Sequence, residues 1–404
     1  MAADPDVLGA GEPAPGASSA EVARINRWTT LILAGFIVGT GCLFFNLMPL
    51  VLASLAGARS LSESQVGFVA ASVNAGAFLG TLASVLWIRR YSWKRATAGS
   101  AVAAGLCMAG LIVSDGYVPT LVFGLLMGWG QAFMIASPIA MLSDTRAPSR
   151  NFAAMVGLQV AMASVLAMVI PSLEEVGSFP AIMGMIAALT LSCGALALGL
   201  PDRGLRGVGD STELAPGTAV SNAPIFLSLG GLLVFYIGLI SVWGFAGILG
   251  EEWGLSPGEI ASAVSISLVA GISGSMVAGY LGERVAPLSA IAAGFLGMGA
   301  TFALFAWGDG YLLFLLALVA MNGLWNFSIA YQLGLISSFD VTGRFAILMT
   351  ASQTAGAFLG PAIMGLMLDA TEGFGPGLAF ASSWMVVAFG LLWKANRWSA
   401  PREG

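Results

Sequence analysis

Long apolar stretches alternate with short polar segments along almost the whole chain. The first stretch runs from Trp28 to Ala58 and contains no Asp, Glu, Lys or Arg. Most of these stretches reach the ~20 residues that a helix needs to cross a hydrocarbon core. The pattern therefore predicts an all-α polytopic membrane protein with twelve transmembrane helices. They are expected at residues 29–56, 65–88, 96–113, 119–142, 151–172, 179–199, 223–249, 259–281, 287–306, 311–336, 345–368 and 375–394.

One polar interior segment, residues 201–222, is longer than the others and separates two sets of six predicted helices. We expect an N-terminal half at 28–200, a cytoplasmic linker at 201–222 and a C-terminal half at 223–394. The ends, 1–27 and 395–404, are expected to be cytoplasmic tails. The N-terminal tail is rich in Ala, Pro, Gly and Ser and lacks the basic and apolar regions of a signal peptide, so we expect it to be disordered.

Composition supports the same class of protein. The chain is 57 % hydrophobic and only 9 % charged, whereas soluble domains carry about 25 % charged residues. There is no histidine, and Cys42, Cys107 and Cys193 all fall in apolar stretches. We expect these cysteines to be small buried hydrophobic residues, and we expect no metal and no cofactor.

The positions of the basic residues predict the orientation. With twelve helices both termini lie on one side, and all but Arg59 of the 16 Lys and Arg residues fall on that side. Cytoplasmic loops carry an excess of Lys and Arg. We therefore expect both termini in the cytoplasm and the protein in the cytoplasmic (inner) membrane.

Short matches recur at a constant spacing of 194 residues. The triplet Asp-Gly-Tyr stands at 115–117 and again at 309–311. Other pairs at this spacing are Leu61-Ser62 with Leu255-Ser256, Arg90 with Arg284, Arg150 with Arg344 and Gln159 with Gln353. In this composition, chance supplies matches of Ala or Gly far more easily than matches of Asp, Arg and Gln. The spacing predicts two six-helix pseudo-repeats in the same orientation, although the first helix of each half shows no match.

A loop motif after predicted helix 259–281 carries a family resemblance. The segment Gly279-Tyr-Leu-Gly-Glu283-Arg284 is similar to the Gly-x-Leu-x-acid-Arg motif of the major facilitator superfamily. Two parallel six-helix repeats joined by a cytoplasmic loop also resemble that family, from about residue 28 to 394. The resemblance implies a secondary transporter whose halves rock around a central site. We expect transport of a small organic solute, secondary active or facilitative, by alternating access.

The first half departs from the family pattern. The register of the repeat puts Arg89-Arg90 where the motif has an acid and an arginine. Proton-coupled relatives often have an arginine four residues before a Gly-x-Gly in the fourth helix, but here Gly124 precedes Gly128-Trp129-Gly130. Predicted helix 151–172 also lacks the Gly-Pro motif of many drug–proton antiporters. A proton-coupled drug or metabolite efflux pump therefore remains the alternative function.

Neutral polar and aromatic side chains are the candidates for solute contact, because no charge lies deep in any predicted span and such a charge is costly. Asn322, Trp325 and Asn326 share one helical face. In the family fold the first, fourth, seventh and tenth helices line the cavity, which adds Thr40, Asn46, Gln131, Tyr236 and Trp243. The other interpretation of these residues is hydrogen bonding between helices. For Gln159 and Gln353, symmetric packing is slightly favoured over solute contact.

Charged residues at the predicted cytoplasmic ends are the candidates for a gate. The family fold places the loop after the eighth helix against the start of the fifth, and the loop after the second against the start of the eleventh. We therefore expect Glu283 to face Arg150 and Arg89 to face Asp340. The predicted gating set also contains Arg90, Arg284 and Arg344. The other interpretation of the arginines is that they only fix the orientation.

The remaining expectations concern chemistry and partners. Glu259, at the start of predicted helix 259–281, is expected to cap that helix in preference to carrying a proton. We expect no enzymatic activity. A membrane-embedded enzyme would need intramembrane acids or histidines, and a transporter-like sensor would need a sizeable soluble domain. The expected partners are a small-molecule solute and the lipid bilayer, with no nucleic acid, and the chain is expected to be a monomer.

Overall fold

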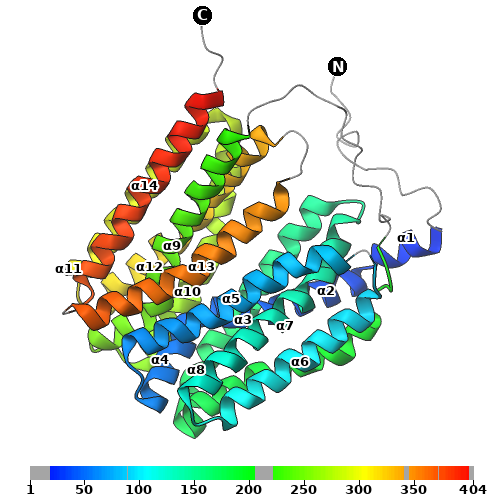
Figure 1. Cartoon of the computed structure of the whole chain (residues 1–404), viewed down its shortest axis with the longest axis horizontal. Helices are drawn as coiled ribbons and strands as arrows, with labels where there is room; N and C mark the ends of the chain where they lie inside the picture. The colour runs from blue at the N-terminus through cyan, green and yellow to red at the C-terminus, as the bar shows by residue number, and fades with distance from the viewer. Residues whose placement is uncertain (1–18, 89, 205–221, 341–344, 372, 400–404) are drawn as a thin grey trace, which may run out of the picture.

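The computed structural model describes residues 19–88, 90–204, 222–340, 345–371 and 373–399. Its regular elements in these ranges are helices, without a strand (Figure 1). The first part of the chain forms α1 (Ser19–Ile25), α2 (Trp28–Gly41), α3 (Leu43–Asn46), α4 (Met48–Arg59), α5 (Glu63–Trp87), α6 (Trp93–Val113), α7 (Tyr117–Ser143), α8 (Pro148–Leu196) and the 3₁₀ helix η2 (Ala197–Gly199). The second part forms α9 (Ala223–Glu252), α10 (Pro257–Leu281), the 3₁₀ helix η3 (Gly282–Arg284), α11 (Pro287–Trp307), α12 (Tyr311–Phe339), α13 (Ala346–Ala370) and α14 (Gly375–Ser399).

Ten helices in the described residues, α5 to α14, are long and apolar enough to cross a membrane. Their ends fall close to the predicted ones, and α5, α6 and α10 each begin after a serine whose hydroxyl caps the helix. Ser62 opens α5 with a capping box, in which its hydroxyl accepts from the backbone of Gln65 while the Gln65 side chain accepts from the backbone of Ser62. Ser256 opens α10 with the same arrangement.

The predicted helix 29–56 is interrupted in the structure. Helix α2 ends at Gly41, the single turn α3 follows, and α4 begins at Met48. Pro49 in the first turn of α4 has no N–H to donate to the carbonyl four residues earlier, that of Phe45. The interruption leaves polar backbone groups of α3 free for partners outside the helix.

Helix α8 (Pro148–Leu196) consists of two helices joined across a kink at Ser178 (φ 50°, ψ −145°), which falls in the stretch 172–179 that was expected to separate two helices. One further difference concerns a segment predicted to be irregular. Residues 19–25 were expected to belong to a disordered tail, but they form α1. Ile25 is 1 % exposed and packs in a cluster with α2, α6 and α7, and this burial explains the local order.

We call α1–α8 the N-terminal half and α9–α14 the C-terminal half. The most extensive contacts between them are those of α5 with α13, α8 with α10, and α4 with α9. We call the end of the bundle at the start of α2 and the end of α14 the terminal end, and the opposite end, where α4 ends and α5 begins, the distal end. Figure 1 shows α4, α5 and α13 converging at the distal end.

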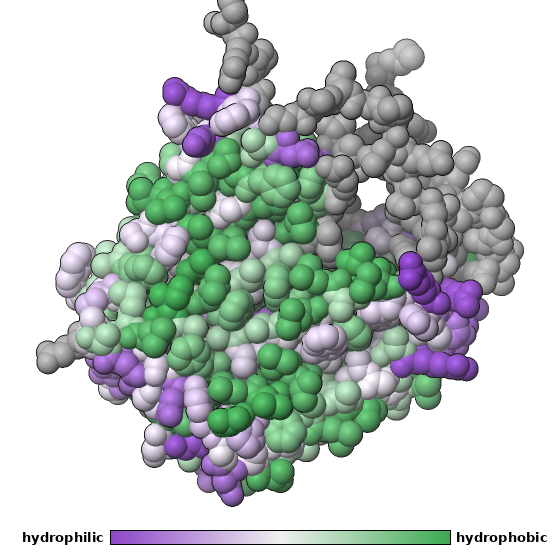
Figure 2. Space-filling model, in the orientation of Figure 1, coloured by the Kyte–Doolittle hydropathy of each residue, from purple (hydrophilic) through white to green (hydrophobic). Residues whose placement is uncertain are grey.

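The outer surface is apolar over most of the helix length. Figure 2 shows broad hydrophobic areas across the bundle, with hydrophilic residues gathered toward the two ends. Large side chains such as Leu106, Val165 and Leu296 are 61–77 % exposed there. Soluble monomers rarely expose apolar patches of this extent, so this surface fits contact with lipid.

Candidate functional site

A cavity of about 220 Å³ lies between the two halves. The turn after α2, α3, α5 and α7 line it from the N-terminal half, and α9 and α13 line it from the C-terminal half. None of its described lining residues is charged. Its polar side chains are the amides of Asn74, Gln131 and Gln353 and the hydroxyls of Thr81, Tyr236, Thr350 and Thr354.

Gln131 is a buried polar group of this cavity whose hydrogen bonding is incomplete. Its side chain is only 6 % exposed, and Nε2 has no hydrogen-bond partner among the described atoms. Asn74, by contrast, donates from Nδ2 to the carbonyl of Ala70 in its own helix (2.9 Å). A buried donor without a partner costs about 1–3 kcal/mol. An acceptor atom of a bound solute would recover this free energy.

An aromatic cluster lies beside the cavity. The ring of Trp325 contacts those of Phe45, Tyr236 and Trp243 edge-on, with centroids 5.9, 6.0 and 6.4 Å away. Trp325 Nε1 also donates to Tyr236 Oη (3.3 Å). Phe45 and Tyr236 reach the cavity themselves, so Trp325 fixes the position of two lining rings.

Trp243 connects the cluster to the interruption in the first helix. Its Nε1 donates to the carbonyl of Phe45 (3.0 Å), the group that Pro49 leaves without its helical donor. Trp243 belongs to α9 and Phe45 to α3, so this bond crosses between the halves. The interrupted helix is thus stabilised by the opposite half at the level of the cavity.

Comparison with solved structures identifies the architecture. A crystal structure of the nucleoside transporter NupG superposes with a TM-score of 0.73 at 12 % identity, covering 92 % of this chain and all (100 %) of that chain. A bacterial homologue of the human lysosomal transporter Spinster, inward-facing and occupied, gives a TM-score of 0.69 at 15 % identity, covering 91 % of this chain and 96 % of that one. The chain has the fold of the major facilitator superfamily. No family model matches the sequence, and comparison with curated proteins gives no match.

Within this major-facilitator fold, the predicted solute-binding residues occupy different surroundings. Gln131 and Tyr236 line the cavity, while Trp325 and Trp243 stand behind its aromatic wall. Thr40 is fully buried in α2, and Asn46, 8 % exposed, lies in α3. Neither of these two is among the residues that line the cavity.

Asn322 and Asn326 lie against α10. Asn322 Nδ2 donates to Ser267 Oγ (3.1 Å), and Asn326 packs where Gly271 leaves room. Asn326 also donates to the backbone of Asn322 (3.0 Å). In this structure both amides therefore have the geometry of hydrogen bonding and packing between helices.

Helix α13 supplies lining residues that the sequence analysis did not select. Thr350, Gln353 and Thr354 follow the spacing i, i+3, i+4, which is the signal that singled out the face of α12. Gln159, the repeat counterpart of Gln353, instead packs against Gly39 of α2. The two glutamines therefore have different surroundings: Gln353 lines the cavity, and Gln159 lies between helices.

The described members of the predicted gating set lie at the terminal end. Arg284 folds back onto its own helix, donating to the Tyr280 carbonyl with its guanidinium 5.1 Å from the Tyr280 ring. Arg150 is exposed, and in the described part of the chain no ion pair joins it to Glu283. Asp340 Oδ2 accepts from the backbone N–H of Phe345 (2.7 Å). Arg90 is exposed, while Arg89 and Arg344 fall outside the described residues.

Glu259 caps its own helix, as the sequence predicted. Its Oε2 accepts from Ser256 Oγ (2.7 Å) and from the Ser256 backbone N–H (2.8 Å). The carboxylate is thereby used at the helix terminus, at the distal end and away from the cavity.

Proposed function

We propose that the chain is a secondary transporter of a small neutral organic solute that works by alternating access. On this proposal α2–α4 form one interrupted crossing and α8 forms two, which gives twelve crossings in two parallel repeats. Both termini then lie in the cytoplasm, and the distal end faces the opposite side of the cytoplasmic membrane.

The observation that carries the proposal is the uncharged cavity between the halves, with the buried Gln131 amide lacking a partner. A charged solute buried there would need a counter-charge, and the described lining offers amides and hydroxyls. A neutral molecule with hydrogen-bond acceptors suits these groups. A volume of about 220 Å³, below the ~300–1,000 Å³ of most ligand pockets, favours a small one.

The aromatic wall narrows the choice of first substrates. Flat rings pack well against aromatic side chains such as Phe45 and Tyr236. One structural neighbour is a nucleoside transporter, and nucleosides are neutral molecules that combine a flat ring with several acceptors. We therefore propose nucleosides as the first class to test.

The predicted solute set and gate stand as parts of this proposal. Trp325 and Trp243 act by positioning Tyr236 and Phe45, whereas Thr40, Asn46, Asn322 and Asn326 would contribute in another conformation of the cycle. The pairs Arg150 with Glu283 and Arg89 with Asp340 would form when the terminal end closes.

Uptake into proteoliposomes tests the function. The purified chain should carry radiolabelled uridine or adenosine, and the dependence on an imposed pH gradient will separate this proposal from a proton-coupled pump. Gln131→Leu should weaken the apparent affinity at least about tenfold, because 1.4 kcal/mol corresponds to a factor of ten. Gln159→Leu, the same change outside the cavity, is the matched control.

If Gln131→Leu and Gln159→Leu both folded well and weakened the apparent affinity equally, Gln131 would not be part of the solute site. Absence of transport across a panel of neutral solutes, with charged ones carried instead, would overturn the proposal of a neutral cargo.

A further inference from the structure

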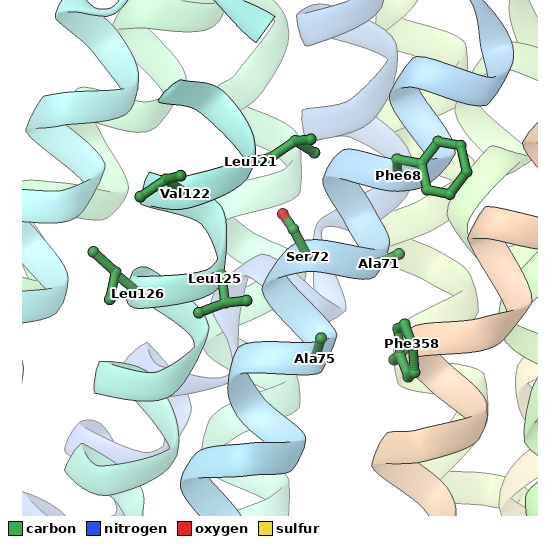
Figure 3. Close-up of a pocket in the computed structure, with 9 residues that line it drawn as sticks. All are labelled: Phe68, Ala71, Ser72, Ala75, Leu121, Val122, Leu125, Leu126 and Phe358. Atoms are coloured by element: carbon green, nitrogen blue, oxygen red, sulfur yellow. The ribbon is translucent and has the colours of Figure 1, made fainter. Parts of the chain in front are cut away.

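A second hollow lies on the outer surface where α5, α7 and α13 meet. Its volume is about 380 Å³, larger than that of the central cavity. Figure 3 shows Ser72 of α5 pointing toward Leu121 of α7, while Phe68 and Ala71 lie on the side of α5 toward Phe358 of α13. We call this hollow the lateral groove.

The chemistry of the lateral groove favours an apolar occupant. Ser72 is the polar side chain among its described lining residues, and its hydroxyl already donates to the Val69 carbonyl (2.8 Å). Phe68 and Leu126 are 39 % and 46 % exposed, so the groove opens outward. Its walls belong to helices long enough to cross a membrane. A polar solute or a peptide would find only the acceptor lone pairs of the Ser72 hydroxyl here, whereas a hydrocarbon chain needs no hydrogen-bonding group.

The groove is separate from the central cavity. A Cβ on Gly76 would overlap the Leu125 carbonyl, and one on Gly128 would overlap the Val73 carbonyl, so the backbones of α5 and α7 touch and close its floor. The opposite face of α5, with Asn74 and Thr81, lines the cavity. Solute in the cavity therefore does not reach the groove.

The groove is continuous with the interface between the two halves, which we call the seam. Helix α5 belongs to the N-terminal half and Phe358 to the C-terminal half, and the same two helices touch where a Cβ on Gly67 would overlap the Pro361 carbonyl. Any occupant of the groove contacts both halves at once. It would therefore contribute to holding them in the arrangement seen here.

We propose that the lateral groove binds one acyl chain of a membrane lipid, which packs between the two halves. The chain fills the apolar hollow beside Ala71 and Ala75 and contacts Phe358 across the seam. The proposal requires only that the protein spans a membrane, so it does not depend on which solute is carried.

Photolabelling of the full chain in liposomes tests this. A phosphatidylethanolamine with a diazirine in its acyl chain should label the segment 121–126 of α7 several-fold more strongly than the exposed surface of α6 around Leu106. Ala75→Trp fills the groove and should reduce labelling of 121–126 to the level of α6. Ala103→Trp, at an exposed alanine of α6, is the control and should leave it unchanged.

Even labelling of α6 and α7 in the unaltered chain would overturn the proposal without reference to any variant, because it would show ordinary lipid contact only. Strong labelling of 121–126 that persists in a folded Ala75→Trp variant would overturn it as well.

Discussion

At the distal end, Asp369 of the C-terminal half accepts hydrogen bonds from Ser62 Oγ (3.1 Å) and from the backbone N–H of Ser64 (3.3 Å) in the N-terminal half. At the terminal end, Asp202, which directly follows the N-terminal half, accepts from Lys94 Nζ (3.1 Å) and Ser92 Oγ (3.0 Å) of that half. The two aspartates make similar bonds at opposite ends of the bundle. Only the first set has to break if the halves separate at the distal end.

Close contacts between helix backbones also join the two halves toward the distal end. A Cβ on Gly67 would overlap the Pro361 carbonyl, one on Gly365 the Glu63 carbonyl, and one on Gly247 the Pro49 carbonyl. Each of these pairs joins one half to the other. Small residues let helix backbones approach this closely, and such packing separates without leaving a buried charge behind.

At the terminal end, the corresponding hydrogen bonds lie within the N-terminal half and the residues next to it. Arg24 donates to the carbonyl of Leu200 (3.3 Å), and the backbone N–H of Arg146 donates to Asn26 Oδ1 (2.9 Å). These bonds connect α1 and the following turn to the ends of α7 and of η2. We infer that this half moves as one body, with its terminal-end contacts preserved when the distal contacts open.

The largest expected effect comes from adding a methyl group to the distal seam. Gly67→Ala should push α5 away from Pro361 at a cost of about 1–3 kcal/mol, typical of overpacking. The population of the distal-closed state should therefore fall about 5–150-fold relative to the open one. Spin labels at Ala58 and Thr371, in a chain with the native cysteines replaced, should report a longer distance across the distal end.

Gly57→Ala is the matched control, because nothing lies within 4 Å of its Cβ position in α4. Both changes improve helix propensity by up to about 1 kcal/mol, so only the contact differs. The distal seam would not hold the halves together if the two variants gave the same label distances.

A smaller effect is expected from the carboxylate of Asp369. It stands at the N-terminus of α5, where a negative charge contributes about 0.3–1 kcal/mol. Asp369→Asn should therefore shift the conformational equilibrium toward the distal-open state only about two- to fivefold, measured with the same pair of labels.

Glu259→Gln is the control for this change, since Glu259 caps a helix of its own half through Ser256. It should leave the label distance unaltered. A shift of equal size in both variants would mean that the effect is one of helix capping and does not depend on the contact between halves.

Much of this architecture was predictable from the sequence. The apolar stretches fixed the long helices because a membrane-spanning helix needs a minimum length of uncharged chain, and the Ser62 and Ser256 caps marked where two of them begin. The interruption near Pro49 was harder to foresee. Proline is tolerated in a first helical turn, and what stabilises the break is the bond from Trp243 to the carbonyl of Phe45, two residues 198 positions apart in the chain.

The composition of the cavity was predicted only in part. Spacing shows which residues of a helix share a face, but not which way that face points once the helix is packed. Asn322 and Asn326 carried the expected signal and lie against α10, whereas Thr350, Gln353 and Thr354 carry the same spacing on α13 and line the cavity. Rotation of a helix about its axis depends on its neighbours, and a single sequence does not record it.

The smallest effect is expected at Asp202, where a substitution should lower the stability of the fold slightly without changing the distance between the halves. Hydrogen bonds from Lys94 and Ser92 hold the pKa of the Asp202 carboxyl below its ordinary value of 3.8. Because the folded pKa is the lower one, the ionised carboxylate stabilises the fold above the ordinary pKa, and this contribution disappears as the pH falls through the folded value. The carboxylate side chain is 62 % exposed, so Asp202→Asn should lower the free energy of unfolding near pH 7 by at most about 1 kcal/mol. The difference between the two proteins should shrink below about pH 4. Thermal unfolding across this pH range measures the loss, with Lys94→Gln expected to give a loss of similar size. The Ala58–Thr371 label distance should stay constant in both variants, because the bond does not join the two halves. A change in that distance would mean that the terminal end takes part in holding the halves in this arrangement.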